Sequence, residues 1–208
     1  MEASSEYAIV YLLPEPAWSY YLDLWAKLER EFRLTGDSRP NIPPHITLKY
    51  IFSADTVDEV EQALAVFSRE TAPAPWSIRG FNHFITPDSY VIFLEVIATT
   101  AARAIHSALL ACMRPIQGLQ WDVYDNADLH FHATLAHRAL TRANFNEVWS
   151  FVNAQEPPAF DLSLDTLTLL KIDGPVHTVH KTFRLVGGVD SPAQTARYLG
   201  DFVLYSGR

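Results

Sequence analysis

One order of strands and helices occurs twice along this chain, and it constrains the fold more than any other feature. Each half reads strand, helix, loop, strand, helix, strand, with apolar residues at helical spacing in the helices and β-branched or aromatic residues in the strands. The elements predicted for the first half are strand 7–13, helix 18–32, strand 45–52, a helix that begins at Asp55 or Thr56, and strand 76–85. Those predicted for the second half are strand 90–97, a helix from Thr99 or Thr100 to Met113, strand 131–137, helix 141–152, strand material over 160–172 and a last strand over 179–186. The repetition predicts a duplicated α+β unit.

Length and composition agree with a single folded unit. The chain has 208 residues, of which 49% are hydrophobic and 19% charged. Such a chain can build a packed core, either as one domain or as two small lobes that share it. We expect one domain over residues 1–208, with repeats at about 7–86 and 90–186. Residues 187–208 form a C-terminal tail, of which 198–205 could dock back on the body.

Charge and cysteine content exclude several functional classes. The 16 Lys and Arg residues against 24 Asp and Glu give a net charge of −8, which disfavours long duplex DNA and anionic membranes but not a short phosphorylated ligand. The single Cys112 excludes a disulfide framework and any multi-cysteine metal site. The apolar run over 7–13 is far shorter than the roughly 20 residues of a membrane span and lacks the basic flank of a secretory signal. We therefore expect a cytoplasmic protein.

Two strands at matching points of the two halves open with nearly the same tetrapeptide. Residues 45–48 read HITL and residues 132–135 read HATL. Alternate residues of a strand share a face, so each tetrapeptide presents an imidazole beside a hydroxyl. The bare pattern His-x-Thr is common by chance, as a third copy at 180–182 illustrates. The placement of the first two copies at matching points of the two halves is the stronger evidence that they are functional.

Two such pairs suit phosphodiester chemistry. An imidazole titrates near neutral pH, so one of His45 and His132 can take a proton from water while the other gives a proton to a departing oxygen. The hydroxyls of Thr47 and Thr134 can donate to non-bridging phosphate oxygens. This chemistry requires neither a metal nor a cofactor. The motif does not say which histidine is the acid and which the base.

The paired HxTL strands, 87 residues apart in a duplicated order, resemble the two-histidine (2H) phosphoesterase superfamily. Within it, the chain is similar to the 2′-5′ RNA ligases and RNA 2′,3′-cyclic phosphodiesterases. The resemblance implies a bilobal, pseudo-twofold α+β fold whose two antiparallel sheets face a central cleft. It also implies metal-independent opening of 2′,3′-cyclic phosphates, with His45, Thr47, His132 and Thr134 at the catalytic positions.

The chain departs from this family in two places that affect the ligand. Family members often have an arginine five residues after the second motif histidine, where this chain has His137 followed by Arg138. The stretch over 114–128 contains Asp122, Asp125 and Asp128 just before the second motif. This charge favours a short RNA end or nucleotide, with a cyclic or 2′-linked phosphate, over a long RNA strand.

Other residues are candidates for holding the ligand. Lys49 and Arg138 could contact its phosphate, and Tyr50, Phe84 and Tyr124 could stack on a base. Two alternatives stay open. The chain could bind a nucleotide or RNA without turning it over, or it could be a zinc hydrolase in which His130 and His132 act with His137 or His83. Otherwise His130 is expected at the rim of the site, and His180 and Thr182 as a surface pair.

Overall fold

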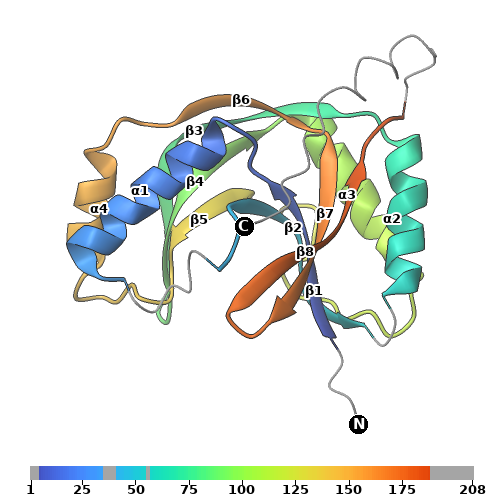
Figure 1. Ribbon diagram of the computed structural model, residues 1–208, viewed down its shortest axis with the longest axis horizontal. Coiled ribbons are helices and arrows are strands. Elements are labelled where there is room, and N and C mark those ends of the chain that lie inside the picture. Colours follow the sequence, from blue (N-terminus) through green and yellow to red (C-terminus); the bar gives the residue numbers. More distant parts are fainter. Residues whose placement is uncertain (1–4, 35–40, 55–56, 188–208) are drawn as a thin grey trace, which may run out of the picture.

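The computed structural model describes residues 5–34, 41–54 and 57–187 and contains eight strands and four helices within them (Figure 1). The strands are β1 (Ser5–Leu12), β2 (His45–Ala54), β3 (Ala74–Ile85), β4 (Tyr90–Ala98), β5 (His132–Ala136), β6 (Ala159–Leu164), β7 (Thr166–Asp173) and β8 (Val176–Arg184). The helices are α1 (Ala17–Phe32), α2 (Asp58–Glu70), α3 (Thr100–Met113) and α4 (Phe145–Asn153).

The strands form two four-stranded sheets, each antiparallel throughout. Their orders are β2-β1-β7-β8 and β5-β4-β3-β6, which confirms the predicted α+β class with two antiparallel sheets. The orders correspond strand by strand, and each HxTL strand lies at the edge of its sheet. The last strand of the first half, β3, pairs with β4 in the sheet of the second half, and β7 of the second half pairs with β1 in the sheet of the first. The two sequence repeats are therefore interlocked in space.

Some predicted boundaries differ from the observed ones, and others lie outside the described residues. The strand material over 160–172 is divided at Asp165 into β6 in one sheet and β7 in the other. Helix α4 begins at Phe145 rather than near Thr141, because the Asn144 Oδ1 accepts the backbone N–H of Thr141 at 2.7 Å and closes a turn there. The helix start at residues 55–56 and the tail over 188–208 lie outside the described residues. The predicted cap of α3 is present, since Thr99 Oγ1 accepts the backbone N–H of Ala102 at 3.2 Å.

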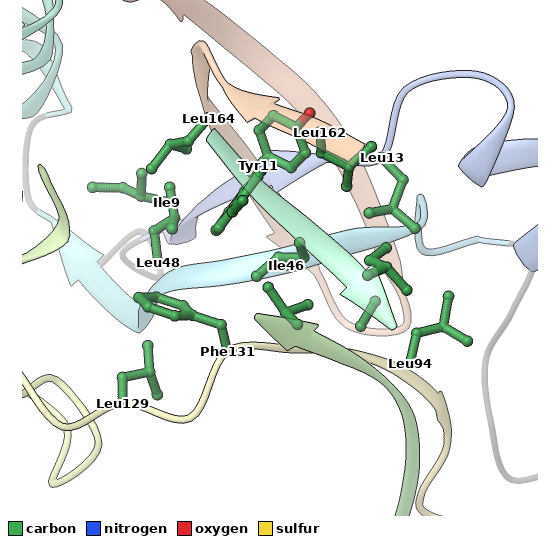
Figure 2. Close-up of a cluster of buried hydrophobic side chains, with 14 of the residues drawn as sticks. Ile9, Tyr11, Leu13, Ile46, Leu48, Leu94, Leu129, Phe131, Leu162 and Leu164 are labelled. Carbon is green, nitrogen blue, oxygen red and sulfur yellow. The ribbon is translucent and has the colours of Figure 1, made fainter. Parts of the chain in front are cut away.

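One apolar cluster joins the two sheets. Figure 2 shows Phe131, which directly precedes β5, packed with side chains of both sheets, among them Ile9, Tyr11, Ile46, Leu48, Leu94, Leu162 and Leu164. Burial of each such side chain stabilises the fold by about 1.5–3 kcal/mol. Helix α1 packs with α4, and α2 with α3, at opposite ends of the molecule (Figure 1). Among the described helices, none combines the length and apolar character needed to cross a membrane.

Candidate active site

The two HxTL strands, β2 and β5, contact each other where the two sheets meet. On their inner faces, Ile46 and Leu48 of β2 and the alanine and leucine of the second motif are buried in the shared core. The histidine and threonine of each motif alternate with them and are half-buried. The expected pairing of an imidazole with a hydroxyl on one face is therefore present in both strands, at adjoining sheet edges.

Both motif histidines are held in the same way. The Nδ1 of His45 lies 2.7 Å from the carbonyl oxygen of Pro43, and the Nδ1 of His132 lies 2.7 Å from that of His130. A carbonyl oxygen only accepts, so Nδ1 carries the hydrogen in each ring. In the neutral imidazole, Nε2 is then the atom that can accept a proton. Two backbone carbonyls, each two residues upstream, thus select the same tautomer twice.

Aromatic rings surround the second histidine. The ring of His132 lies 4.9 Å from that of Phe93 and 5.2 Å from that of Phe84, measured between centroids. Burial among such groups disfavours a charged imidazole and lowers the pKa of His132 below its usual value, and the bond to the His130 carbonyl opposes this only in part. The neutral form, which is the form that accepts a proton, is favoured.

A carboxylate that sequence analysis did not identify lies beside His132. Glu95 of β4 is directly opposite His132 in the strand register. Its Oε1 lies 2.8 Å from the Nε2 of His130, and its Oε2 accepts from the Nδ2 of Asn82 at 2.7 Å. The available signal was a single carboxylate within the otherwise apolar run 90–97. His130 is thus next to the site, as expected of a rim residue.

Two residues outside the motifs hold the motif strands, and neither was identified from the sequence. Tyr21 of α1 donates its hydroxyl hydrogen to the backbone carbonyl of Thr134. His106 of α3 places its Nε2 2.8 Å from the carbonyl oxygen of Leu48. Edge strands have backbone groups without a neighbouring strand, and these side chains pair with two of them. The helix of each half therefore holds the motif strand of the other half.

Lys49 is not where the sequence pattern placed it. Alternation puts Lys49 on the face of Thr47, but β2 has an extra residue between the pairs Val10–Thr47 and Ile9–Lys49. This β-bulge reverses the alternation, so Lys49 points with Ile9 toward the core. Its side chain is fully buried. The expectation that Lys49 contacts a ligand phosphate is therefore corrected.

The buried Lys49 pairs with Asp125 of the loop before β5. Its Nζ lies 2.7 Å from Asp125 Oδ2 and donates to the carbonyl of Gln120 at 2.9 Å. Asp125 also accepts the backbone N–H groups of Tyr50 and Asp122, both at 2.9 Å. The acidic loop is thus less negative than its sequence indicates, because Asp125 is buried and paired while Asp122 remains exposed.

The remaining candidate ligand contacts have different surroundings. The rings of Tyr50 and Tyr124 are 5.2 Å apart, so they pack on each other, and burial raises the pKa of the Tyr50 hydroxyl. Arg138 is exposed on the segment that follows β5. The ring of Phe84 lies against that of His132. The roles of these residues in binding a ligand stay predictions.

The histidines considered for a metal site have other contacts. Nε2 of His130 lies against Glu95, that of His137 is 3.0 Å from Ser89 Oγ, and the ring of His83 packs on Trp149. Within residues 5–34, 41–54 and 57–187, no group of three or more His, Cys, Asp or Glu side chains is placed to hold a metal ion. This arrangement gives the zinc alternative no support.

The third His-x-Thr copy does not join the other two. His180 Nε2 lies 2.8 Å from Glu61 Oε1 of α2, and Lys181 pairs with the same carboxylate. His180 and Thr182 are both exposed, as expected of a surface pair.

A shallow hollow of about 680 Å³ lies at the end of the β3–β4 hairpin, and no residue predicted for the site lines it.

Comparison with known proteins gives the family. The model of the 2′-5′ RNA ligase superfamily matches residues 14–175. A protein of Geobacillus kaustophilus (strain HTA426), "Putative phosphoesterase GK0864", is 31% identical over 153 residues, which cover 72% of this chain and 82% of the relative. A protein of Geobacillus thermodenitrificans (strain NG80-2) with the name "Putative phosphoesterase" is 32% identical over 153 residues, with the same coverage.

Solved structures show the same fold. The crystal structure of TT0787 of Thermus thermophilus superposes with a TM-score of 0.56 at 23% identity, covering 88% of this chain and 99% of that one. The crystal structure of E. coli LigT complexed with 3′-AMP gives a TM-score of 0.57 at 15% identity, with the same coverage. Family model, relatives and fold agree with the two HxTL strands: the chain belongs to the 2′-5′ RNA ligase superfamily, and with it to the two-histidine phosphoesterases.

Proposed function

We propose that this protein is a metal-independent phosphodiesterase that hydrolyses a 2′,3′-cyclic phosphate or a 2′-5′ phosphodiester in a short RNA end or a nucleotide. The observation that carries the proposal is that His45 and His132 are oriented in the same way. The Nδ1 atom of each lies 2.7 Å from a backbone carbonyl oxygen. Family membership supports phosphoester chemistry in general. The 3′-AMP complex of E. coli LigT supports a nucleotide ligand for a protein of this fold.

The proposed reaction uses only groups of this chain and water. One histidine takes a proton from water at Nε2 as the water oxygen attacks phosphorus. The bond from phosphorus to one ribose oxygen breaks, and the other histidine, protonated at the start, gives its proton to that oxygen. The hydroxyls of Thr47 and Thr134 donate to the non-bridging phosphoryl oxygens, where negative charge accumulates. The product is a phosphate monoester and a free ribose hydroxyl.

The charge of the protein supports a small substrate. The protein has a net charge of −8, and the loop before β5 exposes Asp122 and Asp128. Long RNA binding depends on many cationic contacts with phosphates, whereas a terminal or mononucleotide phosphate needs few. Short substrates should therefore be turned over faster than long ones that have the same terminal group.

A substrate panel tests the proposal. Four 2′,3′-cyclic nucleotide monophosphates, oligonucleotides with a cyclic end, and a 2′-5′ linked dinucleotide are incubated with the protein in excess EDTA. The position of the product phosphate is then read by ³¹P NMR. We expect one regiospecific monoester from at least one substrate, and none from the His45→Ala/His132→Ala double variant. Hydrolysis that requires added metal would contradict the proposal, and so would ligand-induced thermal stabilisation without product, which is the result expected of a binding module.

A further inference from the structure

The two motif histidines are held alike but have different neighbours. The residue opposite His45 across the sheet is Leu12, whereas the residue opposite His132 is Glu95. The carbonyl that holds His45 belongs to Pro43, which has no polar side chain. The one that holds His132 belongs to His130, whose imidazole is itself bound to Glu95. The positions opposite the two motif histidines therefore differ, with an aliphatic side chain opposite His45 and a carboxylate opposite His132.

The carboxylate of Glu95 is fixed at both oxygens. Oε1 lies 2.8 Å from the Nε2 of His130, and Oε2 accepts from Asn82 at 2.7 Å. The side chain of Glu95 is 16% exposed, against 46% for that of His130. A carboxylate whose two oxygens both have hydrogen-bond partners is held in one position.

The charge of Glu95 faces the imidazole of His132. Residues directly opposite each other in antiparallel strands have Cβ atoms about 4.5–5.5 Å apart. The charged forms of His130 and His137 disfavour a proton on His132, and Glu95 favours one. Glu95 is thus the negative group that acts on this ring when it takes up a proton.

We propose that Glu95 is a positioning residue for His132. It holds the imidazole of His130 and, through that residue, the carbonyl that orients the His132 ring, and it supplies the negative charge that the ring meets when it carries a proton. In this role Glu95 transfers no proton. This inference rests on the proposed function only for its effect on turnover, since the hold on His132 exists in the protein without substrate.

The chain contains a matched control for this pair. Glu61 of α2 binds His180 with the same atoms at the same 2.8 Å distance, outside the two motif strands. The variants Glu95→Gln and Glu61→Gln each remove one carboxylate charge and keep the side-chain shape. The imidazole of His132 is titrated by ¹H–¹⁵N NMR in the wild type and in both variants, with its signal assigned by its loss in His132→Ala. The kcat and KM of any substrate found above are measured over the same pH range.

We expect Glu95→Gln to lower the titration midpoint of His132 by about 1 pH unit, which is about tenfold in the proton-binding constant. The kcat should fall by about tenfold, with little change in KM. Glu61→Gln should change none of these. A His132 titration that is unmoved in folded Glu95→Gln, or moved equally in Glu61→Gln, overturns the inference whatever happens to turnover. A wild type that hydrolyses nothing overturns the proposed function instead, because the titration is read without substrate.

Discussion

Substitution of Asp125 by alanine removes one partner of the buried ion pair that fixes the loop before β5. The Asp125 carboxylate lies 2.7 Å from the Nζ of Lys49, and both side chains are fully covered. Without it, the ammonium keeps one oxygen partner, the Gln120 carbonyl at 2.9 Å. The backbone N–H groups of Tyr50 and Asp122 also lose the acceptor that they share.

The expected loss is large for a single substitution. Breaking a buried ion pair by removing one partner costs about 3–5 kcal/mol in the free energy of unfolding. In a domain of this size, each kcal/mol lowers Tm by roughly 2–4 °C, so Tm should fall by about 6–20 °C. Burial already lowers the pKa of Lys49. The unpaired amine therefore releases its proton as pH rises, and the loss should be smaller at pH 9 than at pH 6.

Urea denaturation followed by circular dichroism measures this loss, with Asp128→Ala as the control. Asp128 lies in the same loop and is exposed, so its removal should change the free energy of unfolding by no more than about 0.5 kcal/mol. If Asp125→Ala costs as little as Asp128→Ala, the buried pair does not exist in solution. Lys49 would then not be buried in the core as an ion pair.

Three further substitutions test the strands and their surroundings. Tyr21→Phe removes the hydroxyl that donates to the Thr134 carbonyl. We expect the free energy of unfolding to fall by about 0.5–1.5 kcal/mol and kcat to decrease. An unchanged kcat would show that this bond does not hold the motif strand. Burial lowers the pKa of His106, so the unfolded chain binds its proton more readily and stability should decrease as pH falls below about 6.5. His106→Gln should flatten this decrease in urea titrations at pH 7.5 and 5.5, and equal slopes would contradict the assignment. Gly187→Ala places a Cβ 2.4 Å from the backbone of Glu70 and should cost about 1–3 kcal/mol, whereas an unchanged urea midpoint would show that the two segments are not in contact.

Features that depend on local sequence were predictable. His45 and His132 are the first residues of β2 and β5, as the HxTL pattern predicted, because alternation of side chains is set within a strand. Thr99 caps α3 because a hydroxyl before an apolar helix pairs with backbone N–H groups within the same turn. Both signals need only a few neighbouring residues.

Features that depend on distant partners were not predictable. The bulge in β2 turns Lys49 into the core, where Asp125 pairs with it from 76 residues away. Tyr21 and His106 had the signature of ordinary helix residues, yet each bonds a motif strand of the other half. Glu95 lies beside His132 only because β4 pairs with β5. In each case the signal lies in tertiary pairing rather than in the local sequence.

Turnover of a 2′,3′-cyclic nucleotide by three histidine variants in excess EDTA tests the two-histidine site most directly. His45→Ala and His132→Ala each remove one acid–base group, and each should lower kcat by roughly 10²–10⁴-fold. His180→Ala removes the histidine of the third His-x-Thr copy, which binds Glu61 outside the site, and should leave kcat unchanged. If either motif variant, folded and at equal concentration, keeps the turnover of the His180→Ala variant, the two histidines do not share the chemistry and the proposed mechanism is wrong.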